Sequence, residues 1–164
     1  MPRSWNATRL VVLPKVQAPT ATAEFRLISC SSVLYKCLSK LIHQRLKEAL
    51  PFLVDQCQGA FVPNRELLYN VLLGQEITRG YSRKSVVPKC MMKIDLKKAY
   101  DSIHWGFIKE LLEALKFPTA FISWVLACIT MPSYAVSVNG GRYGFFEGDK
   151  GLRQGDPILP LFFV

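Results

Sequence analysis

The chain has 164 residues, half of them hydrophobic and 20% charged, and this composition excludes an intrinsically disordered protein. Lysine and arginine together number 21 and aspartate and glutamate 12, so the net charge at pH 7 is +9. A surplus of this size favours a polyanionic partner, such as nucleic acid or an anionic membrane, although it also serves plain solubility.

The cysteines and the apolar runs indicate an intracellular protein. There are five cysteines and no Cys-x-x-Cys pair, a pattern that predicts neither a zinc site nor a disulfide framework. We interpret them as reduced and mostly buried thiols. The run from Leu10 to Leu13 is too short for the core of a signal peptide, and the run from Phe121 to Met131 is too short to cross a bilayer. We therefore expect neither secretion nor a membrane partner.

The first half of the chain predicts one strand and two helices. Arg9–Val16 is rich in β-forming residues and predicts a strand. Ser32–Leu50 is the clearest helix, because leucines recur at helical spacing between lysines, and Pro51 is expected to stop it. A second helix is expected from about Glu66 to Thr78, and a polar, basic connection follows at 83–89.

The second half predicts one strand, two helices and a hairpin. The short apolar segment Cys90–Asp95 predicts a strand, and His104–Lys116 and Pro118–Thr130 predict helices. Ser133–Asn139 alternates in polarity and ends in an Asn-Gly pair, which indicates a hairpin whose return strand is Arg142–Glu147.

The segment Lys93–Ile103, with the sequence KIDLKKAYDSI, is the first candidate for chemistry. Asp95 ends an apolar strand, where a carboxylate is a rigid ligand for a hard cation such as Mg²⁺, and such ions assist phosphoryl transfer. Tyr100 follows closely enough to form a wall of the same pocket. The alternative is that Asp95 lies at the surface, and that Asp101 or Ser102 only caps the next helix.

The second candidate is Gly151–Pro160, with the sequence GLRQGDPILP. Its glycines let the backbone approach a ligand, and Arg153 and Gln154 offer hydrogen-bond donors beside Gly155. Pro157 suits the first turn of a following helix, and a loop before a helix can hold phosphate or nucleotide. The alternative is an ordinary turn.

Arg26 and Arg65 form the third candidate. Arg26 lies in a β-prone context and Arg65 follows a glycine and a proline. Either side chain is suited to bind phosphate through two hydrogen bonds, and either is equally compatible with a solvated surface charge.

Taken together and in this order, several segments resemble the reverse transcriptase domain of LINE-type (non-LTR) retrotransposons, of the kind abundant in plant genomes. The resemblance extends from Trp5 to Val164. The segments that carry it are WNATRLVVLPKV, FRLISCSSVLYKCLSKLIHQRL, QGAFVPNR, MMKIDLKKAYDSIHWGFI, SYAVSVNGG followed by GFF, and GLRQGDPILP.

The resemblance implies part of a right-hand polymerase, with residues 1–164 forming a partial reverse transcriptase domain. Residues 1–89 correspond approximately to fingers and residues 90–164 to the first half of the palm. The fold implied is α+β, with a mixed or antiparallel palm sheet that is incomplete and backed by helices. The activity implied is RNA-directed DNA synthesis with Mg²⁺, deoxynucleotides (dNTP), an RNA template and a DNA primer, in the nucleus or cytoplasm.

The resemblance also implies roles for individual residues. Asp95 corresponds to a catalytic carboxylate that binds Mg²⁺, and Tyr100 to an aromatic gate under the sugar of the incoming nucleotide. The remaining residues that it assigns to nucleotide and template are Gln154, Gly155, Arg26 and Arg65.

The sequence departs from the family pattern at several points. Leu27, Asn64 and Leu159 stand where the family usually has proline, glycine and serine. No Asp-Asp pair occurs, although the next palm motif of the family carries one and two-metal catalysis needs carboxylates from both segments. We therefore expect an internal slice of a polymerase that is inactive in isolation. The alternatives are a non-catalytic nucleic-acid-binding relic and an unstable pseudogene product, and the oligomeric state stays open.

Overall fold

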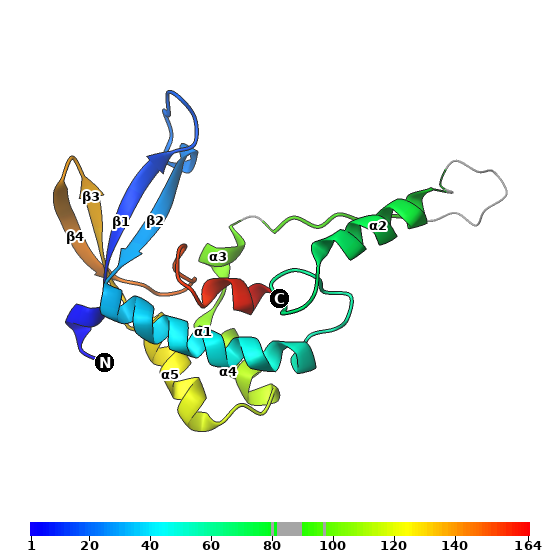
Figure 1. Cartoon of the computed structure of the whole chain (residues 1–164). Helices are drawn as coiled ribbons and strands as arrows, with labels where there is room; N and C mark the ends of the chain where they lie inside the picture. The colour runs from blue at the N-terminus through cyan, green and yellow to red at the C-terminus, as the bar shows by residue number, and fades with distance from the viewer. Residues whose placement is uncertain (80, 82–89, 97) are drawn as a thin grey trace.

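The computed structural model describes residues 1–79, 81, 90–96 and 98–164. A mixed four-stranded sheet stands on a body of helices, and a further helix projects away from that body (Figure 1). This arrangement confirms the expected α+β class. The predicted connection at 83–89 lies outside the described residues.

The sheet has the strand order β2-β1-β3-β4 and combines strands from both sides of residue 89. β1 (Ala7–Pro14) pairs antiparallel with β2 (Phe25–Ser31) and parallel with β3 (Ser133–Val138), which pairs antiparallel with β4 (Gly141–Glu147). The division of the chain into fingers and palm stays a prediction.

The predicted Asn-Gly hairpin is confirmed. Asn139 and Gly140 both have positive φ angles, of 49° and 81°, as the two central residues of a type I′ turn require. The turn aligns Val138 with Gly141, and Gly144 then forms a bulge in β4 at the register shift beside Ala135.

The long helices lie close to their predicted ranges. α1 (Val33–Leu53) begins at Ser32, whose hydroxyl accepts a hydrogen bond from the Tyr35 amide at 3.2 Å, and it continues past Pro51 by two residues. The predicted stop at Pro51 is therefore wrong. The remaining helices are α2 (Leu67–Thr78), α3 (Ala99–Ser102), α4 (Trp105–Ala114) and α5 (Thr119–Thr130), with short 3-10 helices η1 (Arg3–Asn6), η2 (Thr22–Glu24) and η3 (Leu159–Phe163).

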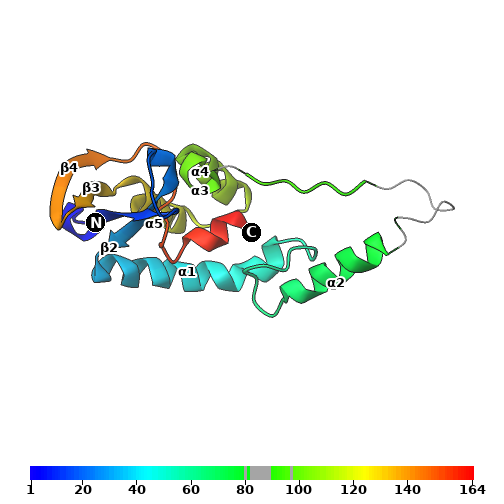
Figure 2. The same cartoon turned by 90° about the horizontal axis from the view of Figure 1, so that it is seen from above.

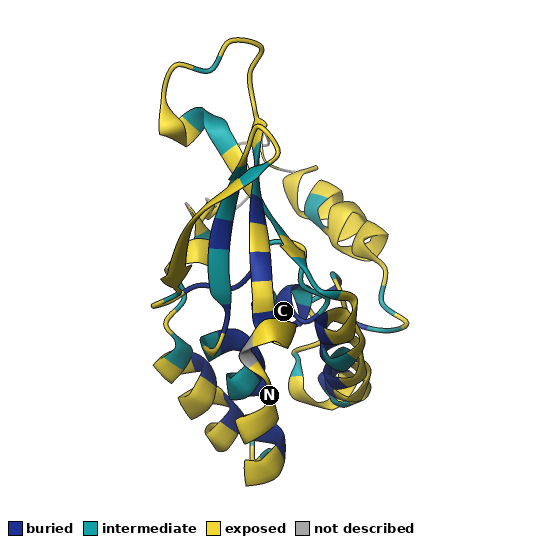
Figure 3. Ribbon diagram, turned by 90° about the vertical axis from the view of Figure 1, so that its left-hand side faces the viewer, coloured by how far each residue is buried: buried dark blue, intermediate teal, exposed yellow. Residues whose placement is uncertain are grey.

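The core lies where α1, α4, α5 and η3 meet. Seen from above, α1 runs along one side of the body, with η3 beside it and α4 and α5 beyond (Figure 2). Tyr35 of α1, Ile108 of α4 and Val125 of α5 are fully buried there. Buried residues gather in this body, whereas α2 and the tip of the β1–β2 hairpin are mostly exposed (Figure 3).

The predicted strand at Cys90–Asp95 is wrong. Residues 90–96 are extended but belong to no strand, and Met92 and Ile94 are 78% and 75% exposed. A strand needs a neighbour for its N–H and C=O groups, and the described sheet supplies none at this segment. The segment is apolar, but apolar residues form a strand only where a neighbouring strand pairs with them.

Two further properties bear on the sequence predictions. Cys128 is buried, but Cys30, Cys37, Cys57 and Cys90 are exposed, so the expectation of mostly buried thiols is wrong. Within the described part of the chain, the helices are all too short or too polar to cross a lipid bilayer.

Candidate nucleic-acid interface

A β-turn presents Gln154 and Gly155, two of the residues that the family resemblance assigns to nucleotide and template. The Asp156 amide donates to the Arg153 carbonyl at 3.0 Å and closes the turn, with Gln154 and Gly155 at its tip. Gly155 has a φ of +102°, in the left-handed region that the third position of a type II turn requires. The Gln154 carbonyl accepts a hydrogen bond from the Ser29 amide at 3.1 Å, so the turn is attached to the edge strand β2.

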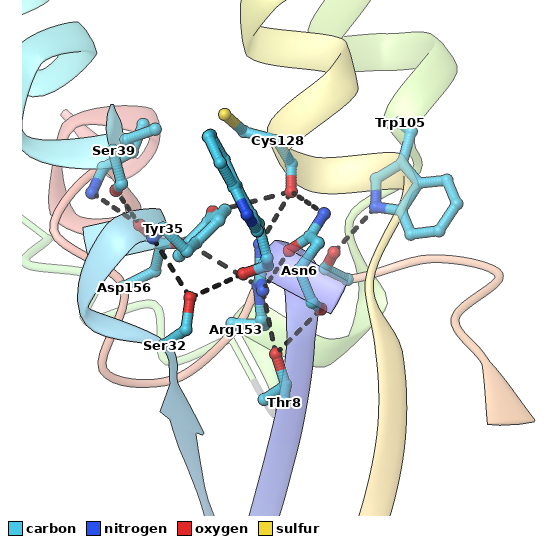
Figure 4. Close-up of polar contacts among 12 residues, drawn as sticks. Asn6, Thr8, Ser32, Tyr35, Ser39, Trp105, Cys128, Arg153 and Asp156 are labelled. Carbon is cyan, nitrogen blue, oxygen red and sulfur yellow. Dashed lines mark hydrogen bonds and ion pairs between the residues drawn. The ribbon is translucent and has the colours of Figure 1, made fainter. Parts of the chain in front are cut away.

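Arg153 at the base of this turn is buried, and its guanidinium is held by hydrogen bonds within the protein. The residue is 5% exposed, and its side chain donates to Asn6 Oδ1 at 2.6 Å, to Thr8 Oγ1 at 2.9 Å and to the Cys128 carbonyl at 2.7 Å. The guanidinium also lies over the Tyr35 ring, 3.8 Å from its centroid. Figure 4 shows these contacts converging from η1, β1, α1 and α5.

Asp156 at the other end of the turn is held equally firmly. Its carboxylate accepts hydrogen bonds from the hydroxyls of Tyr35 and Ser39, both on α1, and lies 3.7 Å from Nε of Arg153. Burial raises the pKa of the Tyr35 hydroxyl far above its ordinary value, and the nearby Asp156 carboxylate raises it further. Tyr35 therefore remains a neutral donor to this carboxylate.

Backbone hydrogen bonds place α3, and with it Tyr100, beside the same loop. The Leu152 amide donates to the Tyr100 carbonyl at 2.7 Å, and the Gly151 amide donates to the Ile103 carbonyl at 2.8 Å. The Tyr100 ring meets Phe163 edge-on, with 4.6 Å between the centroids. The structure thus brings Tyr100 and Gln154 onto one continuous loop assembly.

A cavity of about 240 Å³ lies between this loop assembly and one face of the sheet. Leu10, Leu27 and Ser29 line it from the sheet, and Gln154 closes it from the turn. Polar groups in its lining include Asp101 and Lys150.

The two faces of the sheet differ sharply in charge. Since side chains alternate along a strand, the register places Cys30, Arg9, Ala135 and Phe145 in one row across the four strands. Arg26 on β2 has the same parity as Cys30, and Arg142 on β4 pairs with Ser137, two residues beyond Ala135. Three arginines, Arg9, Arg26 and Arg142, therefore share this face with one carboxylate, Glu147, which pairs with Ser133. We call it the basic face.

The opposite face, which meets the Gln154 cavity, presents no charged strand residue. Its side chains are apolar or hydroxyl-bearing, as at Leu10, Ser29 and Tyr134. Arg26 consequently does not line the Gln154 cavity, and these two predicted nucleotide-binding residues belong to different faces.

The basic face is open and hollowed. A cavity of about 360 Å³ is lined by Arg9, Arg142 and Phe145 together with hydroxyls at the start of α1. Phe145 is 78% exposed, and all three arginines are exposed. Exposed arginines beside an exposed aromatic ring are the combination that binds the phosphates and stacks the bases of single-stranded nucleic acid.

Arg65 has a different place in the fold. Its guanidinium donates to the carbonyls of Val54 at 3.1 Å, Gln58 at 3.0 Å and Pro51 at 3.4 Å, and also to that of Asp55. These carbonyls lie at and just beyond the C-terminal end of α1. The structure thus uses Arg65 as a helix cap, and it does not bring this side chain to the Gln154 turn.

Asp95 is exposed on the extended segment 90–96. Among the residues that the structure describes, no three His, Cys, Asp or Glu side chains come together in a way that would hold a metal ion. The described residues therefore do not form a complete two-ion site, and the role of Asp95 as a Mg²⁺ ligand stays a prediction.

Sequence reasoning missed Arg9, Arg142 and the buried network around Arg153. The strand alternation that puts Arg9 opposite Leu10 was readable, but only the register shows that Arg142 shares its face. The Arg153 partners are separated from it by as many as 147 residues, and no local pattern indicates them.

This architecture, an α+β body with a basic sheet face and a Gln-Gly turn at its edge, is consistent with a fragment of a nucleic-acid polymerase. Residues 13–164 match the family described as Reverse transcriptase (RNA-dependent DNA polymerase), and the chain belongs to that family.

The chain is similar to proteins of non-LTR retrotransposons. It is 28% identical to the Retrovirus-related Pol polyprotein from type-2 retrotransposable element R2DM of Drosophila melanogaster, over 99% of this chain and 15% of that protein. It is 25% identical to the Transposon TX1 uncharacterized 149 kDa protein of Xenopus laevis, over 96% of this chain and 12% of that protein. A type-1 R2 polyprotein of Nasonia vitripennis is 26% identical, over 99% of this chain and 16% of that protein.

These relatives confirm the resemblance to non-LTR reverse transcriptases that the sequence motifs indicated. The chain spans less than a fifth of the length of each. They come from two insects and a frog, so the affiliation with plant genomes stays a prediction.

Proposed function

We propose that this chain is the part of a non-LTR retrotransposon reverse transcriptase that holds the RNA template and the incoming deoxynucleotide against a DNA primer. The observation that carries the proposal is the basic face, on which Arg9, Arg26, Arg142 and Phe145 lie together while the opposite face has no strand charge. Phosphate contacts supply most of the affinity of such proteins and make it dependent on salt. The family match over residues 13–164 supports the same reading.

Binding to a template–primer tests the role of the basic face. We expect fluorescence anisotropy with an RNA template carrying a single-stranded overhang on a DNA primer to give an affinity that falls between 50 and 200 mM salt, roughly as counterion release predicts. Arg9→Gln and Arg142→Gln should each weaken binding and reduce the salt slope by about 1.

Arg79→Gln is the matched control, because Arg79 is an exposed arginine just after the end of α2, with a surface ion pair to Glu76. It should leave the affinity nearly unchanged. An affinity that does not respond to salt, or an equal loss in all three variants, would contradict the proposal.

We also propose that Asp95 supplies one of the metal-binding carboxylates of the complete polymerase, and that the 164-residue chain alone does not polymerise. The family is generally dependent on divalent metal ions, and Mg²⁺ is the ion expected here. Primer extension with an RNA template, deoxynucleotides and Mg²⁺ should give no product. DNA synthesis by the native chain that disappears in Asp95→Ala would support the metal-binding role of Asp95. It would also refute the proposal that the 164-residue chain does not polymerise.

A second candidate is a non-catalytic protein that only binds nucleic acid, inside the nucleus or cytoplasm. The basic face favours it, because the binding of nucleic acid by that face does not require the metal-binding role proposed for Asp95. Salt-dependent binding together with the absence of synthesis, even in a longer form that carries the Asp-Asp motif, would select it. A broad, non-cooperative thermal transition would instead indicate an unstable product.

A further inference from the structure

We infer that Arg153 and Asp156 are positioning residues, which fix the Gln154–Gly155 tip against the sheet through a buried ion pair. The inference rests on the proposed nucleotide and template role of that tip. It assigns a function to two side chains that contact no ligand themselves.

The geometry of the turn is the first step. Arg153 and Asp156 are its first and last residues, and their side chains pair with each other at 3.7 Å beneath the tip. A four-residue turn with glycine at its third position forms without such a pair. The ion pair therefore adds to the turn something that local conformation does not provide.

The burial of both charges is the second step. The side chains of Arg153 and Asp156 are 3% and 8% exposed. Burying an arginine and a carboxylate is costly unless each is paired and hydrogen-bonded. Both conditions are met here, since no buried side-chain nitrogen or oxygen among the described residues lacks a partner.

The direction of the anchors is the third step. Arg153 is fixed to Asn6, Thr8 and the Cys128 carbonyl, which belong to η1, β1 and α5. Asp156 is fixed to Tyr35 and Ser39, which belong to α1 (Figure 4). The two ends of the turn are thus tied to different elements, so the tip cannot rotate relative to the sheet without breaking one set.

The hydrogen bond from the Ser29 amide to the Gln154 carbonyl reports on the tip directly. We expect Asp156→Asn to speed hydrogen exchange of the Ser29 amide, measured by nuclear magnetic resonance, by about tenfold through local opening. Ser39→Ala, which removes a single donor to Asp156, should have a smaller effect and keeps the test available if Asp156→Asn does not fold.

Glu113→Gln is the matched control. It also neutralises a carboxylate in an ion pair, with Lys109 at 3.8 Å, but on the surface of α4. Exchange of the Ser29 amide should not change in this variant. Unchanged exchange in both Asp156→Asn and Ser39→Ala would overturn the inference.

A double-mutant cycle on template–primer affinity distinguishes a positioning role from a general structural role of Asp156. If Asp156 acts through the tip, Gln154→Ala should weaken binding in the native chain but cause little further loss in Asp156→Asn. If the fold-losses of affinity in the two single variants multiply in the double variant, the two residues act independently and the inference is overturned.

The two measurements separate this inference from the proposed function. Faster exchange of the Ser29 amide with no effect of Gln154→Ala on affinity would refute the ligand role of the tip and leave the positioning role in place. Unchanged exchange of the Ser29 amide, together with weaker binding in Gln154→Ala, would refute the positioning role and leave the ligand role of the tip in place.

Discussion

Gly151 allows α3 to pack closely against the loop that carries Gln154. Its φ is +82°, and a Cβ atom placed there would lie 2.9 Å from the Asp101 carbonyl oxygen and 3.0 Å from that of Tyr100. Both neighbours are backbone atoms, which cannot move aside as a flexible side chain would. Glycine is therefore required both for its conformation and for the approach of α3 to the loop.

We expect Gly151→Ala to lower the free energy of unfolding by about 1–3 kcal/mol, because strain and overlap add. Urea unfolding measures this change. Gly106→Ala is the control, since nothing lies within 4 Å of a Cβ at that position in α4. There the substitution should leave stability unchanged or raise it by up to about 1 kcal/mol. Equal effects at both positions would refute the close approach.

The Cys128 thiol makes stability depend on alkaline pH. Burial raises the pKa of this thiol from 9.0 to about 11, and the Asp156 carboxylate acts in the same direction. The folded chain therefore keeps a proton that the unfolded chain releases at lower pH. Its stabilising contribution is complete below pH 9 and is lost as the pH rises through about 11.

We expect the urea midpoint to fall between pH 9 and pH 11, and to fall less steeply in Cys128→Ala. A residual slope remains in that variant, because burial also raises the pKa of the Tyr35 and Tyr134 hydroxyls. Cys37→Ala, at an exposed cysteine of α1, is the control and should keep the native slope. Identical slopes in the native chain and Cys128→Ala would contradict the assignment.

At the level of elements, the end of α1 is defined by a residue outside the helix. Pro51 lacks an N–H group and ordinarily interrupts a helix, yet α1 extends to Leu53. The Arg65 guanidinium accounts for this extension, because it satisfies the carbonyls of Pro51 and Val54, which have no helical donor.

Arg65→Ala should therefore fray the last turn of α1 and cost about 1–2 kcal/mol of stability, the order expected when several carbonyls lose a charged donor. Circular dichroism and urea unfolding measure both effects. Arg65→Lys should not restore the loss, since an ammonium cannot span these carbonyls as a planar fork does. Arg79→Ala, which removes an exposed ion pair, should cost no more than about 0.5 kcal/mol.

The sequence was informative where structure is local. Helical spacing of apolar residues predicted α1, α4 and α5 because each has one face in the core, and the Asn-Gly pair predicted the β3–β4 hairpin because its conformation is intrinsic. Cys90–Asp95 was predicted as a strand from composition alone, and strand formation depends on a partner that composition does not reveal.

The candidate site was predictable only in part. The Gln154–Gly155 turn was found from its glycine and its polar neighbours, which are local signals. The neighbours of Arg153 leave both a ligand donor and an ordinary turn open, because its distant partners, Asn6 and Cys128, cannot be read from adjacent residues. The basic face needed the strand register, which adjacent segments do not fix.

On the scale of the whole molecule, α2 and the extended residues 90–96 contribute little to cohesion. α2 has no buried residue, and residues 90–96 are exposed. The parts of the chain before and after them are joined instead by the β1–β3 pairing and the shared helical core.

Limited proteolysis tests this arrangement. We expect trypsin to cut first after Arg79 or Lys93, where the backbone is accessible, and to leave two fragments on a denaturing gel. The fragments should still migrate as one species on gel filtration, because the sheet contains strands from both. Separation of the fragments without denaturant would show that the sheet does not hold them together.

The buried contact between Arg153 and Asn6 also has a consequence for biosynthesis. These residues are 147 positions apart, so the Asn6 side chain leaves the ribosome long before its partner is made. At the usual elongation rates of 5–20 residues per second, the interval is roughly 7–30 s. β1 lacks its β3 partner for most of that time, and the turn that carries Gln154 joins the buried network only after Asp156 has been made.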